Sequence, residues 1–471
     1  MAGDIVIVFD CGATNVRVVA TGISGNILAS ESFTNNTRPD PIYPSFRIWD
    51  IREIWEKMCR ASSKVMGQID KKRVAGATVT TFGVDGTFFS REGEMLYPVI
   101  SWQCERTKDI MSAIDKYIPL SDLYRENGVL PFAFNTINKL IWFEENKPEI
   151  TEKSHRFLFM PSIFSFFLTG EMTNDTTMAG TSMLTSLRRR EFSAEIFNRI
   201  GVDISLMGIL AEPGTTTGRV TAEAAALTAL PAGTPVVATG HDTQFAIFGS
   251  GAEKNQPVLS SGTWEILMVR SEECKTGGEQ LQLGITTELD PEPGLFNIGN
   301  QWIASGIIEW ARKNLYGDIS GDVYERMISG AESVPSGSRG VRVAPGFYEA
   351  TAGKPGGMIR GLSLESTRDD IFRAILEALS EKLAEGKRAL EDAGGFVTKS
   401  IICVGGGSKN RLWNKLRASY TGVPLKIISQ KETTVLGASL YVQAACGNFS
   451  SPEEARSAIE YKTEIIEPVR I

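Results

Sequence analysis

The chain begins with three short apolar runs that alternate with glycine-containing turns. The runs occupy residues 4–10, 16–21 and 27–33, and Gly12 and Gly22 lie in the polar breaks between them. Apolar and β-branched runs of this length, bounded by glycine, are typical of strands joined by turns. We therefore expect a three-stranded meander at the start of the chain.

Helical and extended patterns alternate after this meander. Residues 49–66 carry apolar side chains at the spacing of an amphipathic helix, and residues 75–80 form the next apolar run. Strands and helices continue to alternate to about residue 240, which is typical of an α/β domain with a mixed sheet. We expect the small polar residues of 174–183 to form a loop at a cleft.

A similar pattern restarts in the second half of the chain. The expected elements are strands at 257–261, 265–270 and 400–404 and helices at 368–393 and 410–420. Both halves thus open with a strand, a glycine turn and a second strand. An internal duplication would place two like domains across a cleft. Hairpins of this kind are common, so taken alone they leave duplication and coincidence about equally open.

Composition narrows the class of protein. With 471 residues and 42% apolar residues, the chain exceeds one ordinary core and predicts two domains, 1–245 and 246–471. The net charge of −7 and the lack of a basic tail argue against a nucleic-acid partner. No membrane span or secretory signal is recognisable, so we expect a cytoplasmic protein. The six cysteines form no CxxC pair and only two histidines occur, which disfavours disulfide scaffolds and zinc sites.

The first candidate for chemistry is the turn from Asp10 to Arg17. Its sequence DCGATNVR places a carboxylate at a strand end and small residues in the turn, where backbone N–H groups can approach phosphate oxygens. Asp10 would face the metal that neutralises the phosphates. Thr14 and Asn15 can donate hydrogen bonds, and Arg17 supplies charge. The alternative is an ordinary hairpin whose polar residues only satisfy turn geometry.

Two further glycine-containing turns are candidates for nucleotide contacts. The sequence SSGTW, with Thr263, occupies the matching place in the second half. The sequence VGGGSKN, with Gly406 and Gly407, lies between an expected strand and helix, where a ligand can rest on bare backbone. It lacks the spacing of a P-loop. The alternatives are a simple turn and a loop that packs a helix tightly onto a strand.

The sequence GHDT at 240–243 lies near the expected domain junction. A carboxylate there can accept a proton from an attacking hydroxyl, and phosphoryl transfer needs little else besides positioning and charge neutralisation. An aspartate that only caps the following helix is an equally good interpretation. Upstream, TFGVDG and SWQCERT combine polar groups with aromatic ones, which suits a sugar. The alternative there is an edge loop with Trp102 in the core.

Taken in order, these motifs resemble the FGGY carbohydrate kinases over nearly the whole chain. FDCGATNVR and SSGTWEI are similar to the two phosphate motifs, CVGGGSKN to the adenosine motif, and GHDT to the stretch with the catalytic aspartate. The resemblance implies α/β architecture with two duplicated actin-like, ribonuclease-H-like domains that close on binding. It also implies ATP and Mg²⁺. Several stretches are most similar to the members that phosphorylate L-fuculose at C1, with those acting on L-rhamnulose next.

The resemblance also implies roles for individual residues. Asp242 would be the general base, and Asp10 the residue facing Mg²⁺. Nucleotide contacts would come from Ala13, Thr14, Asn15, Arg17, Thr263, Gly406, Gly407 and Asn410. Sugar contacts would come from Gly83, Asp85, Trp102, Arg106, His241 and Thr243, with Asn297 and Gln301 as weaker candidates. Ala13 stands where many relatives have glycine or serine, so only its backbone is expected to act.

Other functions stay open at this stage. Another ketose, such as L-rhamnulose, D-ribulose or D-xylulose, could be the acceptor. An actin-like ATPase would bind ATP with related hairpins and transfer no phosphate to a sugar, and a sugar sensor would bind without turnover. The sequence fixes no oligomeric state, and a homodimer stays open.

Overall fold

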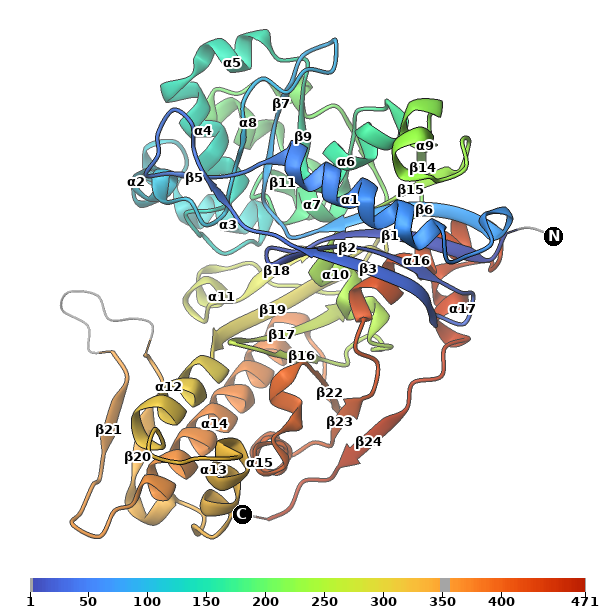
Figure 1. Ribbon diagram of the computed structural model, residues 1–471. Helices are drawn as coiled ribbons and strands as arrows, with labels where there is room; N and C mark the ends of the chain where they lie inside the picture. Colours follow the sequence, from blue (N-terminus) through green and yellow to red (C-terminus); the bar gives the residue numbers. More distant parts are fainter. Residues whose placement is uncertain (1–2, 348–355, 471) are drawn as a thin grey trace.

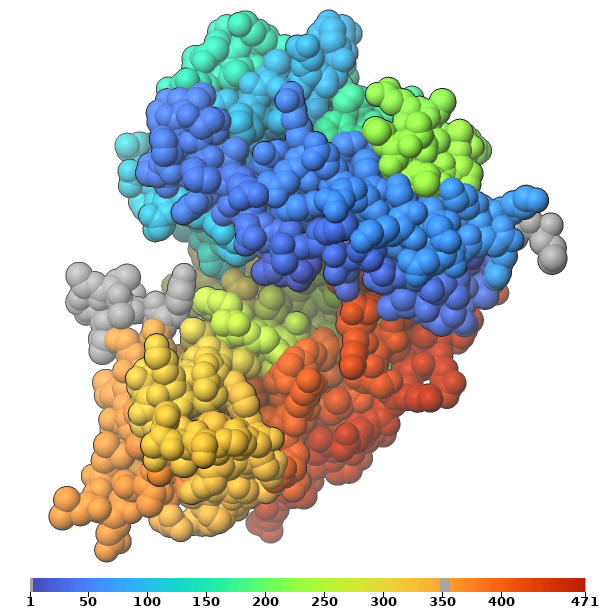
Figure 2. Space-filling view, in the orientation of Figure 1, coloured from blue at the N-terminus to red at the C-terminus, as the bar shows by residue number. Residues whose placement is uncertain are grey.

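The computed structural model describes residues 3–347 and 356–470, which form two lobes, each built around one mixed β-sheet (Figure 1). The surface is hollowed between the lobes in the space-filling view (Figure 2). In the described part of the chain, no helix has both the length and the apolar character that crossing a bilayer requires.

The N-terminal lobe contains a six-stranded sheet in the order β14-β15-β6-β1-β2-β3. Its strands are β1 (Ile5–Cys11), β2 (Asn15–Thr21), β3 (Ile27–Thr34), β6 (Val74–Thr81), β14 (Thr216–Arg219) and β15 (Pro235–His241). The expected meander is confirmed, because β1 pairs antiparallel with β2 and β2 with β3. Strand β1 then pairs parallel with β6, and β6 with β15. The expected helix is α1 (Ile51–Met66), whose apolar face packs on this sheet.

The C-terminal lobe contains a seven-stranded sheet in the order β18-β19-β17-β16-β22-β23-β24. Its strands are β16 (Val258–Ser261), β17 (Trp264–Ser271), β18 (Thr286–Leu289), β19 (Phe296–Ile303), β22 (Ile401–Val404), β23 (Leu425–Ile428) and β24 (Thr463–Ile466). The series β19-β17-β16-β22-β23 repeats the order and directions of β3-β2-β1-β6-β15. The duplication that the hairpins left open is therefore present in the topology.

The remaining elements surround these sheets. The N-terminal lobe adds β4 (Arg38–Pro39), β5 (Arg47–Trp49), β7 (Gly86–Phe89), β8 (Val99–Ile100), β9 (Arg156–Phe159), β10 (Thr173–Asp175), β11 (Thr185–Ser186), β12 (Glu191–Phe192), β13 (Ile209–Ala211), α2 (Lys108–Ser112), α3 (Leu120–Asn127), α4 (Thr136–Asn146), α5 (Pro148–Lys153), α6 (Met160–Thr169), α7 (Thr176–Gly180), α8 (Ala194–Ile200) and α9 (Ala222–Thr228). Later elements are α10 (Asp242–Gly249), α11 (Gly278–Gln282), α12 (Ser305–Leu315), α13 (Val323–Glu332), β20 (Arg342–Ala344), β21 (Met358–Arg360), α14 (Arg368–Gly394), α15 (Arg411–Thr421), α16 (Thr433–Ala445) and α17 (Pro452–Ser457).

The expectation of a loop at 174–183 is wrong. Residues 174–180 lie in β10 and α7, residues 181–183 form the turn that follows, and the whole stretch is buried. The Asp175 side chain accepts a hydrogen bond from the Met178 backbone N–H at 2.9 Å and so caps α7. Small residues are needed because the segment packs closely against β15. A Cβ atom added at Gly240 would lie 2.0 Å from an Asp175 carboxylate oxygen.

The two lobes meet where α10 crosses α16, and the backbones of the two helices are in direct contact there. A Cβ atom at Gly437 would lie 2.0 Å from the Phe245 carbonyl oxygen, and one at Gly249 would lie 2.0 Å from the Thr433 carbonyl oxygen. Helix α16 comes from the C-terminal half of the chain but packs onto β1 and β6, and Val6, Phe245 and Leu436 share one apolar cluster. The crossing therefore fixes α10, whose first residue is Asp242.

We predict that Gly437→Ala lowers the free energy of unfolding by about 1–3 kcal/mol, because the added methyl group must force the two backbones apart. Urea unfolding followed by circular dichroism measures this loss. The matched control is Gly278→Ala at the start of α11, where an added Cβ atom meets no atom within 4 Å. We expect the control to change the free energy by less than about 0.5 kcal/mol. Equal losses in the two variants would contradict the proposed tightness of the crossing.

Candidate active site

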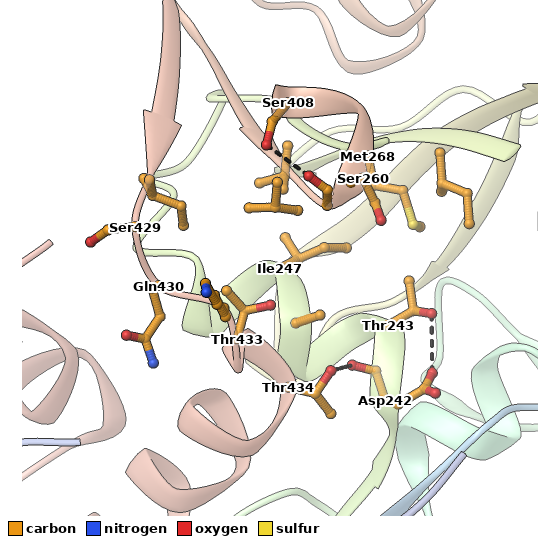
Figure 3. A pocket seen from close by; sticks show the side chains of 18 of the residues that line it. Asp242, Thr243, Ile247, Ser260, Met268, Ser408, Ser429, Gln430, Thr433 and Thr434 are labelled. Atoms are coloured by element: carbon orange, nitrogen blue, oxygen red, sulfur yellow. Dashed lines mark hydrogen bonds between the residues drawn. The ribbon is translucent and has the colours of Figure 1, made fainter. Parts of the chain in front are cut away.

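A cavity of about 720 Å³ opens between α10, the β16–β17 hairpin, the end of β22 and the segment 428–434 (Figure 3). Its apolar wall consists of Ile247, Val258, Ile266, Met268, Val404 and Ile428. Polar groups line the rest, among them Ser260, Gly405, Gly406, Ser408, Lys409, Ser429, Gln430, Lys431, Thr433 and Thr434. An apolar slot beside bare glycine backbone suits a flat heterocycle joined to a polar chain.

Asp242 and Thr243 line the end of this cavity that lies opposite the glycine loop with Ser408 (Figure 3). Helix α10 begins at Asp242, with His241 in the N-cap position and no side-chain cap. Asp242 therefore does not serve as the N-cap. Its side chain is 30% exposed and accepts a hydrogen bond from the Thr243 hydroxyl at 3.1 Å. Burial raises the pKa of Asp242, although the neighbouring His241 opposes the shift. A raised pKa makes this carboxylate a better proton acceptor near neutral pH.

Asp10 lies one residue before the end of β1, near Asp242, and is held by Arg17. The two residues are cross-strand partners in the β1–β2 register, and the Arg17 Nε atom donates to Asp10 at 2.6 Å. Arg17 also forms an ion pair with Glu432 at 2.5 Å, which joins the first hairpin to the segment before α16. Burial raises the pKa of Asp10 to about 6 despite Arg17, and the charges of Asp242 and Glu432 add to the shift. The cluster thus carries more negative than positive charge.

The two glycine hairpins have the tight geometry that their sequences predict. The Gly12 N–H donates to the Asn15 carbonyl at 2.8 Å, and the Gly262 N–H donates to the Trp264 carbonyl at 3.0 Å. Thr14, Asn15 and Thr263 are exposed at the tips, and Ala13 is half-buried. Backbone and hydroxyl donors at both tips are therefore accessible to an anion.

The glycine loop after β22 packs directly on the second hairpin. Gly405 has φ +91°, and a Cβ atom there would lie 2.6 Å from the Ser261 carbonyl oxygen. A Cβ atom at Gly407 would lie 2.1 Å from the Ser261 hydroxyl oxygen. Gly406 is exposed and lines the cavity. Asn410 caps α15 through a 3.0 Å hydrogen bond from the Trp413 N–H, so its side chain has a structural partner.

His241 and Gly83 lie together beside Asp242. A Cβ atom at Gly83 would lie 2.9 Å from His241 Nε2, so only glycine leaves room for the imidazole ring. The Trp102 side chain is 36% exposed and makes an edge contact with Phe134, with ring centroids 6.3 Å apart. It is therefore not the core residue that the alternative interpretation required.

Asp85 and Arg106 lie behind this surface rather than on it. The buried Asp85 carboxylate accepts hydrogen bonds from the Lys139 ammonium, from Trp49 Nε1 at 2.6 Å and from the Trp102 backbone N–H at 3.0 Å. The Arg106 side chain has no exposed surface and pairs with Asp40 at 2.6 Å. Both residues are positioned to support the Trp102 loop.

Asn297 and Gln301 lie on β19 and differ in exposure. Asn297 is fully buried, and its Nδ2 group donates to Gln244 Oε1. Gln301 is exposed on the opposite part of the strand. The structure therefore does not bring these two weaker candidates together.

Several residues of the site were not identified from the sequence. Segment 428–434 contributes five polar lining residues. Its only signal in the sequence is the short polar run SQKETT before an apolar helix. Arg417 connects the Ser261 hydroxyl, at 2.6 Å, with the buried Glu265 carboxylate. Lys139 and Glu288 also went unnoticed, because their partners are far away in the sequence.

Comparisons with known proteins agree with this arrangement. The fold is similar to the crystal structure of xylulose kinase from Rhodospirillum rubrum, with a TM-score of 0.90 and 21% identity, covering 99% of this chain and 94% of that one. An L-fuculokinase from Salmonella typhi is 41% identical across 98% of this chain and 97% of its own length. A rhamnulokinase from Bacteroides thetaiotaomicron is 26% identical across 92% of this chain and 89% of its own length.

The two lobes each correspond to a known sequence domain. Residues 5–249 match the N-terminal domain of the FGGY family of carbohydrate kinases, and residues 258–446 match its C-terminal domain. Each domain carries one of the two glycine hairpins. The match covers well over half of the chain, and its two parts coincide with the repeated strand order. The chain therefore belongs to the FGGY family of carbohydrate kinases.

Proposed function

We propose that this carbohydrate kinase transfers the γ-phosphoryl group of ATP to the C1 hydroxyl of L-fuculose in the cytoplasm, yielding L-fuculose 1-phosphate and ADP. The observation that carries the chemistry is the placement of Asp242 at one end of a cavity whose other end is bare glycine backbone. The choice of sugar is supported by the L-fuculokinase that is 41% identical over nearly its full length.

The lining of the cavity favours one orientation for the nucleotide. The adenine ring would lie against Val258, Ile266 and Met268, with the ribose near Gly406. The phosphates would then extend toward the hairpin tips, where the backbone N–H groups of Ala13, Thr14 and Thr263 and the Arg17 side chain would supply donors and charge. These donors are fixed before the substrate arrives, so little reorganisation is needed during transfer.

Asp10 is the residue that would hold Mg²⁺. Within residues 3–347 and 356–470, no group of three or more His, Cys, Asp and Glu side chains converges as a metal cage. This fits an ion that binds through one or two carboxylates, water and substrate phosphates, as Mg²⁺ usually does. When bound, the ion would neutralise charge on the phosphates.

Asp242 would act as the general base. Its carboxylate accepts the proton of the sugar hydroxyl while that oxygen forms a bond to the γ-phosphorus, and the bond between the γ-phosphorus and the bridging oxygen of ADP breaks. His241, Thr243 and Gly83 border the same space and would contact the sugar. Trp102 offers an apolar face, and Asp85 and Arg106 would hold its loop from behind.

A panel of ketoses tests the substrate assignment. We expect kcat/KM to be highest for L-fuculose among L-fuculose, L-rhamnulose, L-ribulose, D-ribulose and D-xylulose, measured as sugar-dependent ADP release. Phosphorus–proton NMR correlation should place the new phosphate on C1. A higher kcat/KM for another ketose would overturn the sugar assignment. ATP hydrolysis that is as fast without sugar as with it would instead favour an actin-like ATPase.

Asp242→Asn tests the general base. We expect kcat to fall about 10²- to 10⁴-fold with the fold intact, because the amide cannot accept the proton. Stopped assays of sugar phosphate measure the rate, and the melting temperature checks the fold. The control Asp392→Asn removes an exposed carboxylate on α14 that pairs with Lys275, and it should retain wild-type kcat. Turnover of the Asp242 variant within tenfold of wild type would refute the assignment.

A further inference from the structure

The His241 ring lies between two carboxylates that come from different parts of the chain. Its Nε2 atom is 3.6 Å from an Asp242 carboxylate oxygen, and its Nδ1 atom is 3.4 Å from a Glu288 carboxylate oxygen. The His241 and Glu288 side chains are only 11% and 10% exposed. Asp242 belongs to α10 and Glu288 to β18 in the sheet of the C-terminal lobe. The imidazole thus links the candidate base to the other lobe.

Glu288 is held in place by a hydrogen bond from Gln244 and by the anchoring of its strand. Gln244 Nε2 donates to the Glu288 carboxylate at 2.5 Å, and Gln244 Oε1 accepts from Asn297, which faces Glu288 across the β18–β19 ladder. Strand β18 is itself anchored to the N-terminal lobe, because the Thr287 N–H donates to the Gly128 carbonyl at 2.7 Å. The carboxylate therefore cannot move freely away from the ring.

The His241 ring is equally confined. The His241 backbone N–H donates to the Thr177 hydroxyl at 2.9 Å, and the Gly83 backbone lies against the Nε2 atom of the ring. His241 Nδ1 is buried and makes no hydrogen bond with any residue in the described ranges. A proton on Nδ1 has Glu288 as its nearest acceptor within ion-pair distance.

We propose that Glu288 is a positioning residue that keeps His241 protonated, and that the resulting imidazolium keeps Asp242 ionised as the base; this inference rests on the proposed function. The same imidazolium orients the Asp242 carboxylate through its Nε2 side. Without a cation at this point, the closed site would collect uncompensated negative charge.

The surrounding charges support this role. The groups that face His241 are Asp242 on α10, Glu288 on β18 and Asp175 before α7, all of them acidic. Burial works to lower the pKa of His241, but the Glu288 carboxylate, followed by the charges of Asp242 and Asp175, outweighs it and raises the pKa. Asp10 lies on the far side of Asp242, where Arg17 already pairs with it.

Removing the Glu288 charge has two opposite effects on Asp242. The loss of a nearby negative charge directly lowers the pKa of Asp242, whereas the loss of the proton on His241 raises it. The influence of His241 on Asp242 is the larger of the two, because the His241 ring lies 3.6 Å from the Asp242 carboxylate whereas Glu288 lies on the other side of that ring. We therefore expect Glu288→Gln to leave Asp242 less ionised at neutral pH.

Proton NMR offers a direct test because the chain contains only two histidines. With ¹³Cε1-labelled histidine, the wild-type His241 ring should titrate above about pH 6.5, the ordinary value. His155 should titrate below it, since burial and the charges of Arg156 and Arg91 lower its pKa. In Glu288→Gln the midpoint of His241 should fall while that of His155 stays. The control is Glu292→Gln. Glu292 lies in the turn after β18 and pairs with Arg270, so its loss should leave the midpoints of both histidines unchanged.

Kinetics provide the second measurement. The acid limb of the pH profile of kcat/KM should move to higher pH in Glu288→Gln, with activity recovering at alkaline pH. In a His241→Gln background the same substitution should no longer move the acid limb to higher pH, because only the direct effect of the Glu288 charge on Asp242 is left. A wild-type His241 midpoint below that of His155, or an unchanged midpoint in Glu288→Gln, would overturn the inference. Failure of the proposed function is seen separately, as a wild-type enzyme that does not phosphorylate L-fuculose.

Discussion

Helices α10 and α16 approach so closely at Gly249 and Gly437 that neither position has room for a side chain. Much of the site depends on this crossing. Helix α10 carries Asp242 at its start, and α16 follows the segment that lines the cavity and supplies Glu432 to Arg17. The apolar cluster around Phe245 and Leu436 fixes both helices against β1, the strand that carries Asp10. One contact between backbones thus sets the base, the metal-facing carboxylate and one wall of the cavity relative to each other.

The sequence predicted the parts of the fold that depend on neighbouring residues. The hairpins at Gly12 and Gly262 and the helix at 368–393 were expected within a few residues of their observed bounds, because turn residues and apolar spacing are local signals. The expectation failed at 174–183, where small polar residues suggested a loop. Those residues are buried, and a Cβ atom at Gly180 would lie 2.8 Å from Leu289 of β18, a contact that only the tertiary structure creates.

The candidate site shows the same division. Motifs whose function lies in their own backbone, such as the turns at Gly12 and Gly406, were identified from the sequence. The side-chain networks were not, because their members are distant in the chain. Asp85 pairs with Lys139, 54 positions away, and nothing in the sequence indicated that this carboxylate is buried. Glu288 was missed because only the docking of β18 brings it to His241.

The anchoring of β18 to Gly128 constrains how the lobes can move. This hydrogen bond and the α10–α16 crossing are two separate attachments between the halves of the molecule. A rigid rotation that breaks neither must have its axis along the line that joins them. Groups close to that axis sweep only short arcs, and Asp242 shares a helix with one of its pivots. The proton acceptor would then stay nearly stationary while groups far from that axis move through larger arcs.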